Sequence, residues 1–174
     1  MKNGFVLTLI LSLGLMSCSG ITNANGEAQG EKKLMEITPT NKTIKFDSSS
    51  PVFTGNVLLR PLFETHDTSD LTGGEVTFSK NARSAWHTHP KGQLLVVTKG
   101  QGVVQQWGEK ARVMKAGDIV WTPAGVKHWH GADNKNTVTH LALQEKKNGK
   151  NVIWMEKVSD KQYKDGLRSI RSKK

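Results

Sequence analysis

From Val52 to Gln144, short apolar stretches alternate with turns rich in Gly, Asp, Asn and Lys. Short stretches with alternating apolar and polar residues are typical of half-buried strands, and the residues between them are typical of tight turns. Because no segment in this region carries a helical period, the pattern predicts an all-β sandwich or barrel. The expected strands cover residues 53–63, 74–79, 84–89, 93–98, 102–107, 111–114, 118–122, 127–132 and 137–144.

One segment near the end of the chain has the pattern of a helix. Val158–Leu167 opens with Ser159 as a candidate N-cap and meets Gly166 near its end. The chain of 174 residues is long enough for one domain of ordinary size with extensions. We therefore expect a single β domain with a short C-terminal helix over residues 46–165, followed by a basic tail over residues 166–174.

The first residues have the pattern of a targeting segment. Lys2 precedes an apolar stretch of eleven residues, Phe5–Leu15, well short of the ~20 that a membrane-spanning helix needs. The segment ends in LMSC at Cys18, the only cysteine in the chain, and this ending resembles the lipobox of bacterial lipoproteins. The alternative is an ordinary signal peptide, or a short anchor, that contains a cysteine. We expect a signal peptide over residues 1–17, lipidation of Cys18, and a flexible polar tether over residues 18–45.

These expectations place the mature protein at a bacterial cell envelope, lipid-anchored to a membrane and facing the periplasm or the exterior. The formal net charge is +10, and removing residues 1–17 takes away one lysine and no acidic residue, which leaves +9. The lysines are scattered, and no aromatic residues interleave with them as a single-strand nucleic-acid binder requires. We therefore expect no nucleic-acid partner, whereas the basic tail could lie against anionic phospholipid headgroups.

Two histidines and a glutamine lie close together in AWHTHPKGQ, residues 85–93. Side chains at i and i+2 of a strand share a face, so His87 and His89 point the same way. A turn follows, and Gln93 opens the next strand, where its carbonyl oxygen can approach the same point. Imidazole nitrogens placed in this way can bind one metal ion. The alternative is a surface pair of histidines with an unrelated glutamine.

This stretch and GDIVWTPAGVKHWH, residues 117–130, together resemble the two motifs of the cupin superfamily. The matching positions are Asn81, His87, His89, Gln93 and Gly100 in the first motif, and Gly117, Pro123, Gly125 and His128 in the second. This chain departs from the pattern at Asn81, where glycine is usual, at Gln93, where glutamate is usual, and at Ala132, where asparagine is usual. Asparagine also enters positive φ, so the first departure is tolerable. The resemblance implies a single-domain antiparallel jelly-roll barrel that encloses a metal held by His87, His89, Gln93 and His128.

This ligand set is neutral, which affects its chemistry. Three imidazoles and one amide leave a divalent cation with its full formal charge, so the site is a stronger Lewis acid and binds its metal less tightly than one with glutamate in place of Gln93. An amide cannot accept a proton, so any general base has to come from elsewhere. The donors suit Mn²⁺, Fe²⁺, Co²⁺, Ni²⁺ or Zn²⁺.

A closer resemblance covers residues 50–163, almost the whole domain. It is carried by FTGNVLLRPLF, SAWHTHPKGQ, GDIVWTPAGVKHWHGA, THLALQE and WMEKVSDKQY. These segments are similar to those of bacterial manganese-dependent cupin hydroxynitrile lyases, and of small cupins found beside carboxymuconolactone decarboxylase-type domains. The resemblance favours Mn²⁺ as the cofactor. It also implies a pocket lined by His130, His140, Gly74, Val76 and Gln144.

His130 and His140 are the candidates for the general base. His130 lies two residues beyond His128 and shares its face. In THLALQ, strand alternation puts His140 on the cavity side, while Leu141 and Leu143 pack outside the barrel or against a neighbour. The alternative for each histidine is a hydrogen-bonded structural role.

The resemblance implies a metal-dependent enzyme that acts on a small molecule, a C–C lyase that cleaves a cyanohydrin into an aldehyde and cyanide. Two alternatives stay open, because one scaffold hosts many chemistries. The chain could be a quercetinase-like cupin dioxygenase that uses Fe²⁺ or Mn²⁺, or a non-enzymatic lipoprotein that binds a metal or a small ligand. Small barrels expose sheet edges and faces that need cover, so we also expect a homo-oligomer, either a dimer or a tetramer.

Overall fold

The structure is a computed structural model that describes residues 34–39 and 41–171. The predicted signal peptide, Cys18, much of the predicted tether and the last three residues of the predicted tail lie outside the described residues. The chain divides into two compact units, Met1–Glu36 and Ile37–Lys174, and every helix and strand described here belongs to the second. In the part of the chain that the structure covers, no helix is long and apolar enough to cross a membrane.

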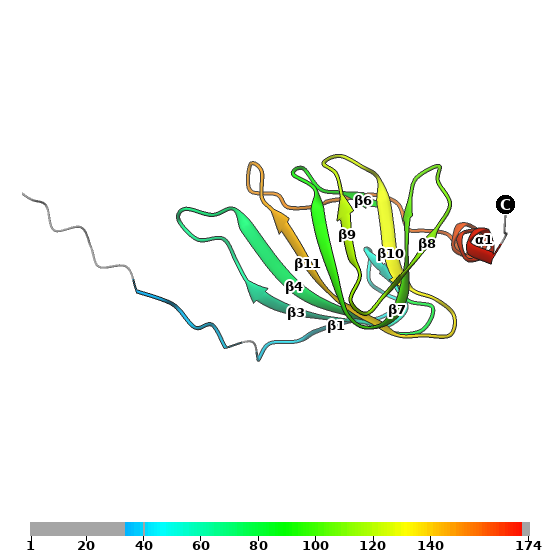
Figure 1. The fold of residues 1–174 in the computed structure, drawn as a ribbon, viewed down its shortest axis with the longest axis horizontal. Coiled ribbons are helices and arrows are strands. Elements are labelled where there is room, and N and C mark those ends of the chain that lie inside the picture. Colours follow the sequence, from blue (N-terminus) through cyan, green and yellow to red (C-terminus); the bar gives the residue numbers. More distant parts are fainter. Residues whose placement is uncertain (1–33, 40, 172–174) are drawn as a thin grey trace, which may run out of the picture. The chain divides into compact units, whose positions relative to one another are not determined.

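Antiparallel strands make up most of this second unit (Figure 1). The elements are β1 (Ile44–Phe46), β2 (Phe53–Thr54), β3 (Val57–Phe63), β4 (Leu71–Phe78), β5 (Arg83–Ser84), β6 (His87–Thr88), β7 (Gln93–Gln106), β8 (Arg112–Lys115), β9 (Ile119–Thr122), β10 (His128–Ala132), β11 (Val138–Glu145), β12 (Ile153–Trp154) and α1 (Asp160–Arg171). The sheet runs in the order β1-β3-β4-β11-β7-β10-β5-β2, and β6, β8, β9 and β12 pair beside this path.

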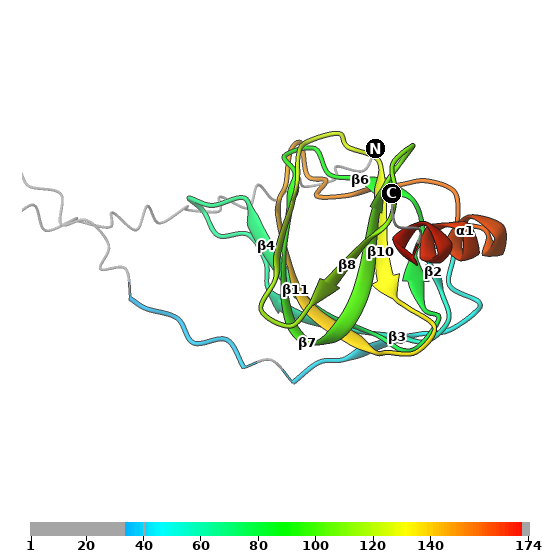
Figure 2. The same cartoon turned by 45° about the vertical axis from the view of Figure 1, so that its right-hand side comes forward.

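The longest strand, β7, joins the two walls of the sheet. Its first half pairs with β9 and β11, and its second half pairs with β8 and β10. Figure 2 shows the strands curving around an interior. A sheet that bends back in this way forms a nearly closed antiparallel barrel, which confirms the predicted jelly-roll fold.

Some strand boundaries differ from the prediction. The sequence predicts two strands over residues 93–98 and 102–107, but β7 runs through both without a break. Gly100 has a φ of 74°, and the register between β7 and β11 shifts close to it, so the chain bends within the strand instead of turning back. The strands expected over residues 53–63 and 84–89 are each divided in two, into β2 and β3 and into β5 and β6.

Apolar side chains at alternate strand positions fill much of the barrel interior. Residues i and i+2 of a strand share a face, so Val76 and Phe78 of β4 point into the same core as Leu95 and Val97 of β7. The other buried members are Phe53, Val57, Ala82, Met114, Ala132, Val138 and Ala142. Removing this apolar surface from water is the main driving force for closing the barrel.

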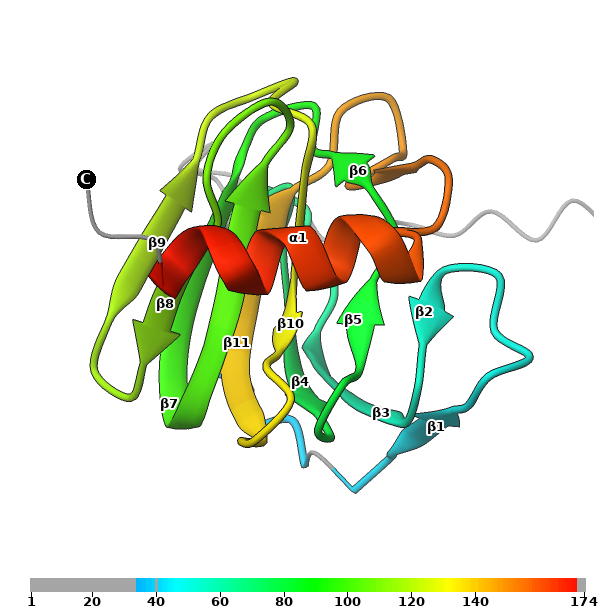
Figure 3. The same cartoon turned by 90° about the vertical axis from the view of Figure 1, so that its right-hand side faces the viewer.

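The helix α1 covers part of the outer surface of the barrel (Figure 3). Trp86 and Trp129 alternate with the histidines of their segments, so they point outward and pack with Val158 and Tyr163. The same alternation that turns the tryptophans toward the helix therefore turns the neighbouring histidines toward the barrel interior.

The helix begins as predicted and ends later. The Ser159 hydroxyl accepts a hydrogen bond from the N–H of Gln162 at 3.2 Å, and the Gln162 side chain accepts one from the N–H of Ser159 at 2.9 Å. This reciprocal pair is a capping box. The helix then continues through Gly166 to Arg171, so most of the predicted basic tail is helical. A Cβ at Gly166 would lie 2.9 Å from Oε1 of Gln105, so the glycine allows a close approach to the barrel.

Candidate metal centre

The six predicted metal and catalytic residues all lie in buried positions of the barrel. Their exposed fractions are at most 5 %. They are His87 in β6, His89 just after it, Gln93 at the start of β7, His128 and His130 in β10, and His140 in β11. His128 pairs directly with His87 across neighbouring strands, so segments about forty residues apart meet here.

Three of these histidines are held by the same kind of hydrogen bond. The Nδ1 atoms of His87, His89 and His128 each lie 2.6–2.9 Å from a backbone carbonyl oxygen. A carbonyl only accepts, so each Nδ1 carries the proton and donates it. A neutral imidazole has one N–H, which leaves each Nε2 with a free lone pair, the form that binds a metal. The three carbonyls belong to Ala85, Asn151 and Val126, respectively.

The Nε2 atom of His128 faces the side-chain oxygen of Gln93 at 3.1 Å. The amide nitrogen of Gln93 donates to Oε1 of Gln144 at 3.2 Å, which turns the Gln93 oxygen toward the histidine. Since the one proton of neutral His128 is on Nδ1, the two facing atoms are both acceptors. Converging lone pairs repel each other unless a cation lies near both, so this contact indicates a cation site.

The tightest group consists of His87, His128 and His130, whose ligand nitrogens all lie within 4.8 Å of one another. The His89 ring centroid is 5.1 Å from that of His87 and 5.6 Å from that of His128. The Nε2 atom of His89 is buried and has no hydrogen-bond partner among the described residues. The structure therefore brings His130, which the sequence predicts as catalytic, next to the expected ligands and leaves His89 outside the tightest group.

The protonation of these side chains also suits a metal. Burial lowers the pKa of His89 to about 4 and holds the pKa of His87 well below its usual value, with His128 adding to the shift at His87. No proton then competes for the Nε2 lone pairs at neutral pH. The three-histidine cluster, with an amide oxygen and an unpartnered imidazole nitrogen beside it, fits a divalent metal site.

A hydrogen bond joins the two candidate bases, because Nδ1 of His130 lies 3.1 Å from Nε2 of His140. Both rings pack against Phe78, at centroid distances of 5.5 and 5.8 Å. Burial lowers the pKa of His140 to about 4. Burial, and then the neighbouring histidines, hold the pKa of His130 well below its usual value. Both rings are therefore neutral at pH 7, and each has one unprotonated nitrogen.

A cavity of about 210 Å³ lies beside the histidines. Its lining includes Gly74, Val76 and Gln144, the three residues that the sequence predicts around the pocket. The register explains their position, because Val76 pairs with His140 and Gly74 pairs with Ala142 across β4 and β11. The cavity is also bordered by His87, His89, Gln93 and His130.

Sequence reasoning missed other residues that line this cavity. They are Phe53, Leu59, Asn151, Val152 and Trp154. Strand alternation could have indicated Leu59, which lies two residues after the buried Val57 in β3 and therefore shares its face. Asn151 follows a turn with no periodic pattern, yet its carbonyl holds His89 and its side chain donates to Thr72 at 3.0 Å. No local signal marks this residue.

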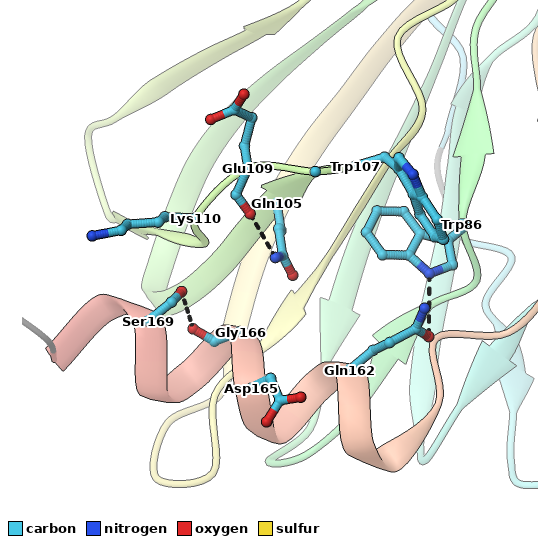
Figure 4. Close-up of a pocket in the computed structure, with 10 residues that line it drawn as sticks. Trp86, Gln105, Trp107, Glu109, Lys110, Gln162, Asp165, Gly166 and Ser169 are labelled. Atoms are coloured by element: carbon cyan, nitrogen blue, oxygen red, sulfur yellow. Dashed lines mark hydrogen bonds between the residues drawn. The ribbon is translucent and has the colours of Figure 1, made fainter.

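A separate hollow lies between α1 and the outer surface of the barrel (Figure 4). Trp86 and Trp107 line it, and Nε1 of Trp86 points toward Oε1 of Gln162 in α1 at 3.5 Å. The Lys127 ammonium lies 3.6 Å from the centroid of the Trp107 ring, a cation–π contact. Of the six predicted metal and catalytic residues, all of which the structure describes, none lines this hollow.

A jelly-roll barrel with a cluster of inward-facing histidines defines a cupin. Residues 74–143 match the cupin domain family, and the chain belongs to the cupin superfamily. It is 45 % identical over 130 residues to an (R)-mandelonitrile lyase of Granulicella tundricola. The alignment covers 75 % of this chain and 99 % of that protein, so the chain resembles a hydroxynitrile lyase over nearly the whole length of that relative.

Solved structures agree with this assignment. A cupin-like protein from Thermotoga maritima has a TM-score of 0.66 and is 31 % identical, and the match covers 80 % of this chain and all of that one. The polyketide cyclase RemF from Streptomyces resistomycificus has a TM-score of 0.58 over 79 % of this chain and 99 % of its own. At 16 % identity, that second likeness shows the fold alone.

Proposed function

We propose that this chain is a metal-dependent hydroxynitrile lyase that cleaves cyanohydrins into an aldehyde and cyanide. The likeness to an (R)-mandelonitrile lyase supports the class of reaction. The facing acceptor atoms of Gln93 and His128 are the single observation that carries the metal dependence, because a cation relieves their repulsion.

The residues that would hold the cation are His87, His89, Gln93 and His128, with His130 beside them. Mn²⁺ is favoured by the resemblance to manganese-dependent cupins, while the donor types also suit Fe²⁺, Co²⁺, Ni²⁺ or Zn²⁺. A divalent cation bound there supplies Lewis acidity, which lowers the pKa of a hydroxyl group or polarises a carbonyl. Because every protein donor is neutral, no ligand carboxylate offsets that charge.

The His130–His140 pair would take the proton of the cyanohydrin hydroxyl. Gln93 cannot do so, because an amide is not a base at neutral pH. When Nδ1 of His130 donates to Nε2 of His140, the Nε2 atom of His130 is free to accept a proton. The Nδ1 proton can then pass to His140, which spreads the new charge over two rings. In the direction of synthesis the pair returns the proton.

The cavity selects for small substrates with an apolar part. Phe53, Leu59 and Val76 supply apolar surface, and only about 210 Å³ is available. Gln144 is fixed by a hydrogen bond from its amide to the Thr72 hydroxyl at 3.1 Å, so a polar group meets the substrate in a set orientation.

The test is an assay of the full-length chain, loaded with Mn²⁺, for aldehyde release from mandelonitrile. We expect release well above the rate in buffer, and we expect His128→Ala to lose both bound metal and activity. Release by the loaded wild type at the buffer rate would overturn the lyase assignment. Oxygen uptake with flavonol-type or diketone substrates, measured in parallel, distinguishes a dioxygenase from a lyase.

A further inference from the structure

His128 also borders a second cavity, of about 670 Å³, which is lined mainly by β7, β8 and β9. Its lining includes acidic and basic side chains, unlike the described lining of the smaller cavity of about 210 Å³ beside the histidines. Val104, Val120 and Val126 supply an apolar wall, and Gln106 and Thr122 add neutral polar groups. In addition, three charged residues line it, which are Glu109, Lys110 and Arg112.

Strand pairing places Arg112 on the inner face of the barrel. Val104 of β7 pairs with Arg112 on one side and with His130 on the other, and paired residues of antiparallel strands share a face. Met114, two residues after Arg112 in β8, is buried in the interior core. The guanidinium therefore extends from the same face as the histidines, at the exposed end of β8.

No described carboxylate forms an ion pair that neutralises the charge of Arg112. Lys110 likewise forms no ion pair among the residues that the structure describes. Among the described residues that line this cavity, Glu109 is the one carboxylate, so their net charge is positive. Figure 4 shows the side chain of Glu109 directed away from α1.

We propose that this second cavity is a binding site for small organic carboxylates. The carboxylate pairs with the planar guanidinium of Arg112, which offers two parallel N–H donors, and Lys110 adds positive charge nearby. The organic part lies against the wall of Val104, Val120 and Val126. The site does not depend on the proposed lyase activity, but it places a bound acid next to His128.

Benzoate is a suitable probe, because it joins one carboxylate to one compact apolar ring. Isothermal titration calorimetry on the purified full-length chain gives its Kd with and without Mn²⁺. We expect Arg112→Gln to raise the Kd about tenfold or more, since charge-assisted hydrogen bonds are roughly twice as strong as neutral ones. Arg112 is exposed, so this substitution leaves the core intact.

Lys115→Gln is the matched control. Lys115 lies in the same strand, next to Met114 and on the opposite face, so its loss changes the net charge equally without touching the cavity. We expect this variant to bind benzoate as the wild type does, and Glu109→Gln to bind it more tightly. Benzamide, a neutral analogue, should not distinguish Arg112→Gln from the wild type.

Two outcomes would overturn the proposal. In one, Arg112→Gln and Lys115→Gln weaken benzoate binding equally, which would indicate attraction by overall charge alone. In the other, benzoate binding requires Mn²⁺ and has the same Kd in Arg112→Gln as in the wild type, which would indicate coordination to the metal. Because calorimetry needs no turnover, either result is independent of whether the chain cleaves mandelonitrile.

Discussion

Nδ1 of His130 and Nε2 of His140 lie 3.1 Å apart inside the barrel, on strands β10 and β11. For the two nitrogens to form a hydrogen bond, one donates and the other accepts, according to the tautomers of the two rings. The other nitrogen of His140 is buried without a hydrogen-bond partner among the described residues. Burying a nitrogen without a partner costs free energy. The ring that bears this cost contacts His130, which lines the cavity.

Replacing His140 with glutamine tests whether this pair transfers a proton. The amide oxygen of the variant could still accept a hydrogen bond from Nδ1 of His130, but it cannot take up the proton, so we expect aldehyde release to fall about 100-fold or more. The measurement is kcat with mandelonitrile, together with elemental analysis of the variant. Metal content should stay at the wild-type level, because His140 is outside the group of ligand nitrogens. A variant with normal metal and normal kcat would show that His140 has only a structural role.

Removal of the metal should abolish activity and leave the barrel folded. We expect a chelator to remove the cation and added Mn²⁺ to restore activity, and we expect His89→Ala and His128→Ala to bind substoichiometric metal. Elemental analysis gives the metal content, and circular dichroism checks the fold.

His66→Ala is the control for these histidine variants, because His66 is exposed and should bind metal as the wild type does. Full metal content in both His89→Ala and His128→Ala would contradict the predicted ligand set.

The sequence predicts which face each histidine occupies, because strand alternation is a local property. His87, His128 and His140 all point inward as their patterns predict, and the neighbouring Trp86 and Trp129 point outward. A local sequence pattern, that of a helix N-cap, also correctly places Ser159 at the start of α1. The sequence likewise correctly indicates that Asn81 tolerates positive φ, since its φ is 66°.

Local patterns cannot predict which distant segments meet. The pairing of His128 with His87, the nearness of His130 to the expected ligands, and the carbonyl that holds His89 all depend on how the sheet closes. Gly100 shows the same limit. A glycine between two apolar stretches suggests a turn, whereas the observed chain continues as one strand with a bend.

Stability should fall as the pH drops from about 6.5 toward 4. Burial lowers the pKa of His89 and of His140 to about 4 in the folded chain, from an unperturbed value of 6.5. Between these values the unfolded chain binds more protons than the folded chain, so acid favours unfolding. Each such histidine contributes a slope of about 1.4 kcal/mol per pH unit within this window and none above it. Urea denaturation of the metal-free chain at several pH values measures the effect.

His140→Gln again provides the control for this pH dependence. The variant has one buried histidine fewer. The slope of its unfolding free energy against pH should therefore be smaller than that of the wild type by the contribution of about one proton across the same window. An unchanged slope would mean that His140 is already protonated in the folded chain, contrary to the lowered pKa.

Gly100 and Gly108 form a matched pair that separates backbone strain from steric overlap. Their φ values are 74° and 81°, so alanine is strained at both positions. A Cβ at Gly108 meets nothing within 4 Å, whereas a Cβ at Gly100 would overlap the backbone carbonyl of Thr137. We expect Gly108→Ala to lower the free energy of unfolding by about 1–2 kcal/mol, the usual penalty for this conformation.

Gly100→Ala should be several kcal/mol worse than Gly108→Ala, because relieving the overlap requires β11 to move away from β7. Since β11 carries His140, this variant should also disturb the contact between His130 and His140 and lose activity beyond its loss of folded protein. Urea denaturation of the two variants gives the difference directly. Equal losses at the two glycines would mean that the β7 bend can relax around a methyl group, and that positive φ alone accounts for the glycine at position 100.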